Sequence, residues 1–256
     1  MDNEGKVDLS KENIAHLLAA RDVYNECLDL LGKWGPIVTT AINKQNPNRL
    51  DVLYYDILQR LNKSIYDLTL LPPQSCNIIS TRLNLRSIFA DLIVALSLLT
   101  RDKIMAEALC YAFDLEGTKK LLQHFELEKE LFSYCPQPPV KPESVEKILL
   151  KLTEEKDVAQ RKMVSGGANK GMITIKSLAE SIKDSTNTDI PPYLYNILFS
   201  PYLFLSQTEH YSVVNRQHSY FDHDEIFFFE IYSKKIKYGL QCFITAAAKY
   251  FNISQD

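Results

Sequence analysis

One stretch of the chain decides the fold: residues 78–99, IISTRLNLRSIFADLIVALSLL. Apolar residues cover most of its faces at helical spacing, which is typical of a helix surrounded by other helices. The stretch is long enough to span a bilayer, but it contains Arg82, Arg86 and Asp91, and each charge would cost roughly 3 kcal/mol at the bilayer centre. The sequence therefore predicts a core helix at the centre of a bundle.

Amphipathic stretches on both sides of this helix predict more helices. Apolar residues recur at helical spacing over residues 9–31 and 50–68, which precede it, and over residues 103–131, which follow it. Residues 135–142 hold four prolines, which remove hydrogen-bond donors and fix extended dihedrals, so we expect a stiff linker there.

These patterns predict an all-α protein, a multi-helix bundle with a peripheral helical insertion. Residues 1–134 are expected to supply the N-terminal helices of the main bundle, and residues 143–184 the insertion. Residues 191–256 are expected to complete the bundle with aromatic-rich helices. Of the 26 Tyr and Phe residues in the chain, 16 fall between Tyr193 and Phe251. The three successive phenylalanines at 227–229 cannot share one helix face, so they need contacts from more than one side.

Charge and cysteine content exclude several classes of function. Lys and Arg number 29 against 32 Asp and Glu, a net charge of -3, so no global field attracts a polyanion and any nucleic-acid contact must be local. The five cysteines lack a Cys-x-x-Cys pair, which argues against a zinc site or a disulfide framework, and we expect no cofactor. The first ten residues are acidic where a secretory signal would be basic, so we expect a cytoplasmic chain without a membrane partner.

The charges of the central helix are candidate binding residues. Arg82 and Arg86 are four residues apart and share a face, whereas Arg86 and Asp91 point about 140° apart and cannot form an ordinary intrahelical pair. A guanidinium inside an apolar bundle needs a carboxylate, a helix end or a bound anion. Two interpretations stay open: a structural arginine bonded to another helix, and an arginine that binds an anion or an RNA phosphate.

Ser206 and His210 form a second candidate pair, one helical turn apart. Histidine readily serves as an acid or base at neutral pH. A nucleophilic serine would also need a strained turn and an orienting acid, which the sequence does not display. A hydrogen-bonded pair in the core is therefore the favoured interpretation.

The run Leu85-Arg86-Ser87-Ile88-Phe89, followed at a distance by Ser206-x-x-x-His210, resembles an uncharacterised all-helical bacterial family of unknown function. In that family an Arg-Ser-Leu-Phe-Glu-like stretch precedes a distal Ser-x-x-x-His. The likeness covers about residues 78–210. The family's usual carboxylate, four residues after the arginine, falls on Ala90 here, with Asp91 beside it.

That family is in turn similar to the HEPN helical bundles, many of which resemble toxins or defence nucleases that cut RNA without a metal through Arg-x(4–6)-His. Arg216 and His223 have six residues between them, just before the last expected helix. The resemblance implies that His223 exchanges protons with the ribose 2′-OH or the leaving oxygen, while Arg216 stabilises charge on the phosphorane. It also implies that two subunits contribute to the site. His210, from the Ser206-x-x-x-His210 spacing, is a third candidate catalytic residue.

Two other interpretations remain open for the C-terminal quarter. The protein could be a non-catalytic binding or assembly module whose aromatic residues form the interface, including self-association. The cluster at 218–225 could bind a divalent metal, but an acidic cap at the start of the last helix is favoured. The cluster consists of His218, Asp222, His223, Asp224 and Glu225.

Overall fold

The computed structural model describes residues 11–43, 47–70, 78–132, 134, 141–206 and 223–251. These residues form eight α-helices, one short 3-10 helix and no strand, which confirms the all-α prediction. The elements are α1 (Lys11–Ile42), α2 (Arg49–Leu70), α3 (Ile78–Leu99), α4 (Lys103–Leu131), α5 (Pro142–Ser165), η1 (Lys170–Ile173), α6 (Ile175–Lys183), α7 (Leu194–Ser206) and α9 (His223–Tyr250). Within the described ranges, none of these helices combines the length and apolarity needed to cross a membrane.

The chain divides into two compact units. Unit 1 combines residues 1–100 with residues 178–256, and unit 2 comprises residues 101–177. The boundary between them falls within α6 at one end and directly before α4 at the other.

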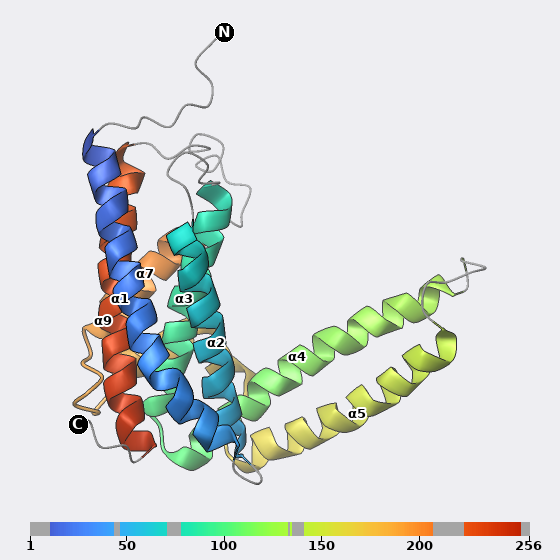
Figure 1. Cartoon of the computed structure of the whole chain (residues 1–256). Coiled ribbons are helices and arrows are strands. Elements are labelled where there is room, and N and C mark those ends of the chain that lie inside the picture. Colours follow the sequence, from blue (N-terminus) through green and yellow to red (C-terminus); the bar gives the residue numbers. More distant parts are fainter. Residues whose placement is uncertain are drawn as a thin grey trace. The chain divides into compact units, whose positions relative to one another are not determined.

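Helix α3 is the central helix of unit 1, as the sequence predicts. It packs against α2, α7 and α9, while α1 packs against α2 and lies beside α9 (Figure 1). Its fully buried large side chains are Ile88, Phe89, Leu92, Ile93 and Leu96. Burial of such side chains stabilises the folded state by about 1.5–3 kcal/mol each relative to exposure, so α3 contributes much of the core of this unit.

Unit 2 contains a helical hairpin in which α4 packs against α5 (Figure 1). The short helix η1 also packs on α4. This division differs from the one expected from the sequence, which placed residues 103–131 in the main bundle. An apolar stripe predicts that a helix has a buried face but does not identify the partner, and the partner found here is α5.

The structure also differs from the sequence-based prediction at one proline. Pro142 was expected to belong to the stiff linker, but it is the first residue of α5. Proline is well tolerated there because the first helical residues have no intrahelical acceptor for their N–H groups.

Candidate functional site

A pocket in unit 1 lies between α3, α7 and α9. It is a shallow hollow that opens to solvent, and its space of about 290 Å³ includes part of that open solvent, so it is a surface groove and not an enclosed cavity. An arginine and two exposed rings stand beside buried residues in its wall, which consists of Arg82, Leu85, Phe204, Leu205, Phe228, Phe229 and Tyr232. We call this the Arg82 pocket.

The aromatic rings of the Arg82 pocket are partly presented to solvent. Phe204 is 49% exposed and Phe228 is 41% exposed, and their ring centroids are 6.3 Å apart. Phe228 also stacks on Tyr232, with centroids 6.0 Å apart and planes inclined by 22°. Burial raises the pKa of Tyr232 to about 12, although the nearby charge of Arg82 opposes this. Tyr232 therefore remains a neutral phenol at physiological pH.

Arg86, one turn after Arg82 on α3, contacts the last turn of α7. Its Nε donates to Ser206 Oγ at 3.3 Å and an Nη donates to the Tyr202 hydroxyl at 3.4 Å. The guanidinium also lies over the Tyr202 ring, 5.3 Å from the centroid. Ser206 Oγ in turn donates to the Tyr202 carbonyl at 2.6 Å. A cation at this position is favoured by the carbonyl end of the α7 dipole.

Asp91 belongs to a different part of α3 and pairs with Arg60 of α2. Arg60 donates from Nε to Oδ2 at 3.1 Å and from Nη2 to Oδ1 at 2.9 Å. The side chain of Asp91 is 13% exposed and that of Arg60 is 52% exposed. Burial raises the pKa of Asp91, and the hydrogen bonds from Arg60 oppose the rise. This geometry gives Asp91 a structural role, and Arg60 is a residue that the sequence analysis missed.

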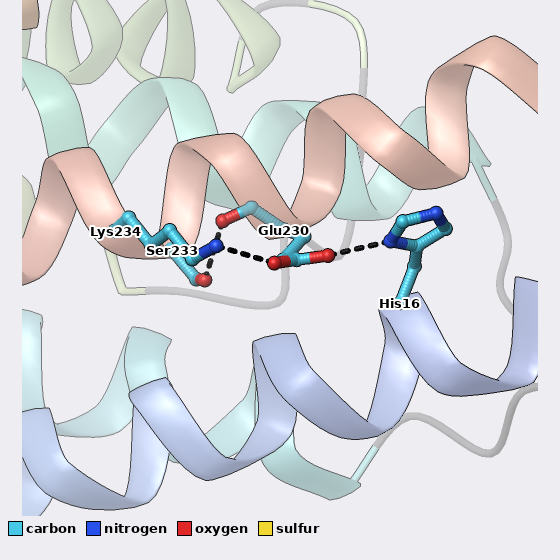
Figure 2. A network of polar contacts seen from close by, with 4 residues as sticks. All are labelled: His16, Glu230, Ser233 and Lys234. Carbon is cyan, nitrogen blue, oxygen red and sulfur yellow. Dashed lines mark hydrogen bonds and ion pairs between the residues drawn. The ribbon is translucent and has the colours of Figure 1, made fainter.

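Between α1 and α9 lies a polar network that the sequence analysis also missed (Figure 2). His16 Nδ1 and Glu230 Oε2 are 2.5 Å apart, and Lys234 Nζ lies 2.5 Å from the other carboxylate oxygen. Ser233 Oγ donates to the Glu230 carbonyl at 2.7 Å. The hydrogen bonds from Lys234 and His16 lower the pKa of Glu230. Glu230 is therefore an ionised carboxylate that holds an imidazole on the opposite helix.

Ring contacts connect this network to the Arg82 pocket. The His16 ring meets Phe227 edge-on, with centroids 5.5 Å apart and planes inclined by 75°. The ring centroids of Phe227 and Phe228 are 6.3 Å apart, and those of Phe228 and Phe204 are also 6.3 Å apart. We call Phe204, Phe227 and Phe228 the aromatic ridge. The expectation that the phenylalanine run is contacted from more than one side is confirmed, by α1 and by α7.

The other predicted site residues can be placed only in part. His210 and Arg216 lie outside the described residues, as do His218 and Asp222 of the possible metal cluster. His223 is the first residue of α9, four residues and thus about one turn before Phe227, and its side chain is outside the described part. The structure thus groups Arg82, Arg86 and Ser206 at α7 and separates Asp91 from them.

Two of the cysteines in the described part of the chain are held in the protonated form. Burial raises the pKa of Cys27 to about 12 and also raises that of Cys242, so neither is a thiolate at neutral pH. Within the described ranges, no group of three His, Cys, Asp or Glu side chains could hold a metal ion.

Comparison with known proteins adds no assignment. No family model, curated protein or solved structure matches the chain. The family resemblance in the sequence remains a prediction, and the function has to be argued from the chemistry of the site.

Proposed function

We propose that the protein binds single-stranded RNA at the Arg82 pocket and the aromatic ridge, and cleaves it without a metal. The observation that carries the proposal is the position of Arg82 beside the exposed rings of Phe204 and Phe228.

The residue types suit the chemistry of an unpaired RNA strand. Guanidinium groups pair with phosphate oxygens through a planar set of donors, and exposed aromatic rings stack on bases. Stacking needs bases that are not already paired within a duplex, which favours a single strand. Because the net charge is -3, binding would depend on these local cations, with Arg86 one turn from Arg82.

Cleavage is the part of the proposal that comes from the resemblance to HEPN proteins. His223 would transfer a proton at the ribose 2′-OH or the leaving oxygen, and Arg216 would stabilise the phosphorane charge. The position of His223 at the start of α9, one turn before the ridge residue Phe227, supports this assignment.

Binding is tested by fluorescence anisotropy with a labelled single-stranded RNA over a range of salt concentrations. We expect Phe228→Ala to weaken binding about tenfold and Arg82→Gln to reduce the salt slope by about one. The matched control is Arg21→Gln, an exposed arginine of α1 in the same unit, which should change neither. Unchanged affinity in both site variants would contradict the proposal.

Cleavage is tested by gel analysis of the same RNA in the presence of EDTA. We expect His223→Ala to abolish cleavage while leaving the affinity for RNA unchanged. Cleavage that disappears with EDTA in the wild-type protein would contradict a metal-independent mechanism.

A protein-binding role is the second candidate, favoured by neighbouring exposed apolar residues on α7 and α9. They are Leu203, Phe204, Phe227 and Phe228. If the protein binds no RNA but forms a dimer that Phe228→Ala dissociates, as measured by analytical ultracentrifugation, this face is an interface between two copies instead.

A further inference from the structure

RNA cleavage by the 2′-hydroxyl needs two proton transfers. The O2′–P bond forms as the 2′-OH gives up its proton, and the P–O5′ bond breaks as O5′ gains one. A base and an acid are therefore required, but the proposed function names only His223 for this work. A second proton-transfer group is present beside the aromatic ridge.

His16 is built as an oriented imidazole. A carboxylate can only accept hydrogen bonds, so the 2.5 Å contact with Glu230 places a proton on His16 Nδ1. In the neutral ring this leaves the lone pair on Nε2, which points away from Glu230 and has no hydrogen-bond partner among the described residues (Figure 2). The side chain is 23% exposed, so a ligand can reach the ring.

The position of His16 also fits the RNA path in the proposed function. Its ring rests against Phe227 at one end of the aromatic ridge, and the Arg82 pocket contains the other end. His223 precedes Phe227 by one turn on α9. A base stacked on Phe227 would lie next to the His16 ring, which contacts that phenylalanine edge-on.

We propose that His16 is the second proton-transfer residue of this site, with Glu230 as its positioning residue; the inference rests on the proposed function. His16 Nε2 takes the proton of the 2′-OH as O2′ attacks phosphorus, and His223 gives a proton to O5′ as the P–O5′ bond breaks. The products are a 2′,3′-cyclic phosphate and a 5′-hydroxyl, and no metal or oxidant takes part. Glu230 stabilises the imidazolium formed on His16 and keeps its own charge throughout.

The decisive variant is His16→Asn, because the asparagine amide can occupy the place of Nδ1 and keep the bond to Glu230 but cannot transfer protons. We expect the rate constant for cleavage at saturating RNA to fall about 10²–10⁴-fold, with the Kd for RNA and the thermal midpoint unchanged. The matched control is His124→Asn in α4, another histidine with its ring edge-on to a phenylalanine, 5.2 Å from Phe125. His124→Asn should leave the rate constant, the Kd and the thermal midpoint unchanged.

A separate variant tests whether Glu230 acts as a positioning residue for His16. Within the described residues, His16 pairs with Glu230 of α9, which is also bonded by Lys234. Glu230→Gln removes the charge that stabilises the imidazolium but keeps an acceptor beside His16, so the rate constant for cleavage at saturating RNA should fall while the Kd for RNA stays unchanged. A purely structural glutamate would change the thermal midpoint and leave that rate constant in place.

The outcomes separate the two proposals. If His16→Asn cleaves RNA at the wild-type rate while His223→Ala remains inactive, the role of His16 is overturned and the proposed function stands. If the wild-type protein neither binds nor cleaves single-stranded RNA, both are overturned.

Discussion

Replacing Arg60 should destabilise the protein more than replacing Asp91, because the side chain of Asp91 is buried and that of Arg60 is half-exposed. In Arg60→Met the carboxylate of Asp91, whose side chain is 13% exposed, loses both donors inside the core of unit 1. Removal of one partner from a buried pair costs about 3–5 kcal/mol at neutral pH. In Asp91→Asn the amide oxygen still accepts from Arg60, which is 52% exposed and also reaches water, so the cost should be about 1 kcal/mol.

The penalty of Arg60→Met should also depend on pH. Burial raises the pKa of Asp91, and Arg60→Met removes the hydrogen bonds and the charge that oppose that rise. A raised folded-state pKa makes the ionised carboxylate destabilising above it, so the penalty should shrink as the pH falls through that value. Replacing both residues, as in Arg60→Met with Asp91→Leu, should restore stability close to that of the wild type.

Urea denaturation measures these differences, followed by far-UV circular dichroism and by the fluorescence of Trp34, the single tryptophan, which lies on α1 in unit 1. The control Arg21→Met, at an exposed site of α1, should stay within about 0.5 kcal/mol of the wild type. An Asp91→Asn variant as unstable as Arg60→Met would refute the reasoning. A penalty for Arg60→Met that stays constant into acid pH would refute it as well.

Two further predictions concern packing and pH. Gly166→Ala would place a methyl group 2.4 Å from Ala108 Cβ, so it should destabilise the α4–α5 hairpin by about 1–3 kcal/mol in urea denaturation. In Gly117→Ala on α4, the added methyl group meets no described atom within 4 Å outside the backbone of its own helix, so this change should stabilise the protein by up to about 1 kcal/mol. Equal changes in stability for the two variants would contradict the close packing at Gly166. The lowered pKa of Glu230 means that its contribution to stability is present above the ordinary glutamate pKa and is lost as the pH falls through the folded-state value. The urea midpoint of the wild type should thus drop more than that of Glu230→Gln from roughly pH 5 to pH 3, and parallel curves would count against the network.

The sequence predicts the helices well because each carries its own pattern. In α3, apolar residues on most faces indicate a surrounded helix whatever its neighbours are, and Phe89 and Leu92 are fully buried. The partner of a helix is not encoded in the same way. The stripe of α4 fits a main bundle as well as it fits α5, and only the three-dimensional structure distinguishes them.

The site is harder to predict because it depends on contacts between distant residues. Helical geometry excludes Arg86 as the partner of Asp91, but it cannot select Arg60, 31 residues away, from the other cations. His16 and Glu230 are 214 residues apart, and neither lies in a motif. Their pairing follows from the packing of α1 on α9, for which the sequence carries no local signal.

The most direct test of the central claim is to map the residues that RNA contacts. A single-stranded RNA containing 4-thiouridine can be crosslinked by ultraviolet light and the modified peptides identified by mass spectrometry. The RNA proposal predicts crosslinks at Phe204 and Phe228 that decrease in Arg82→Gln. Crosslinks confined to unit 2, or equally strong in the variant, would contradict it.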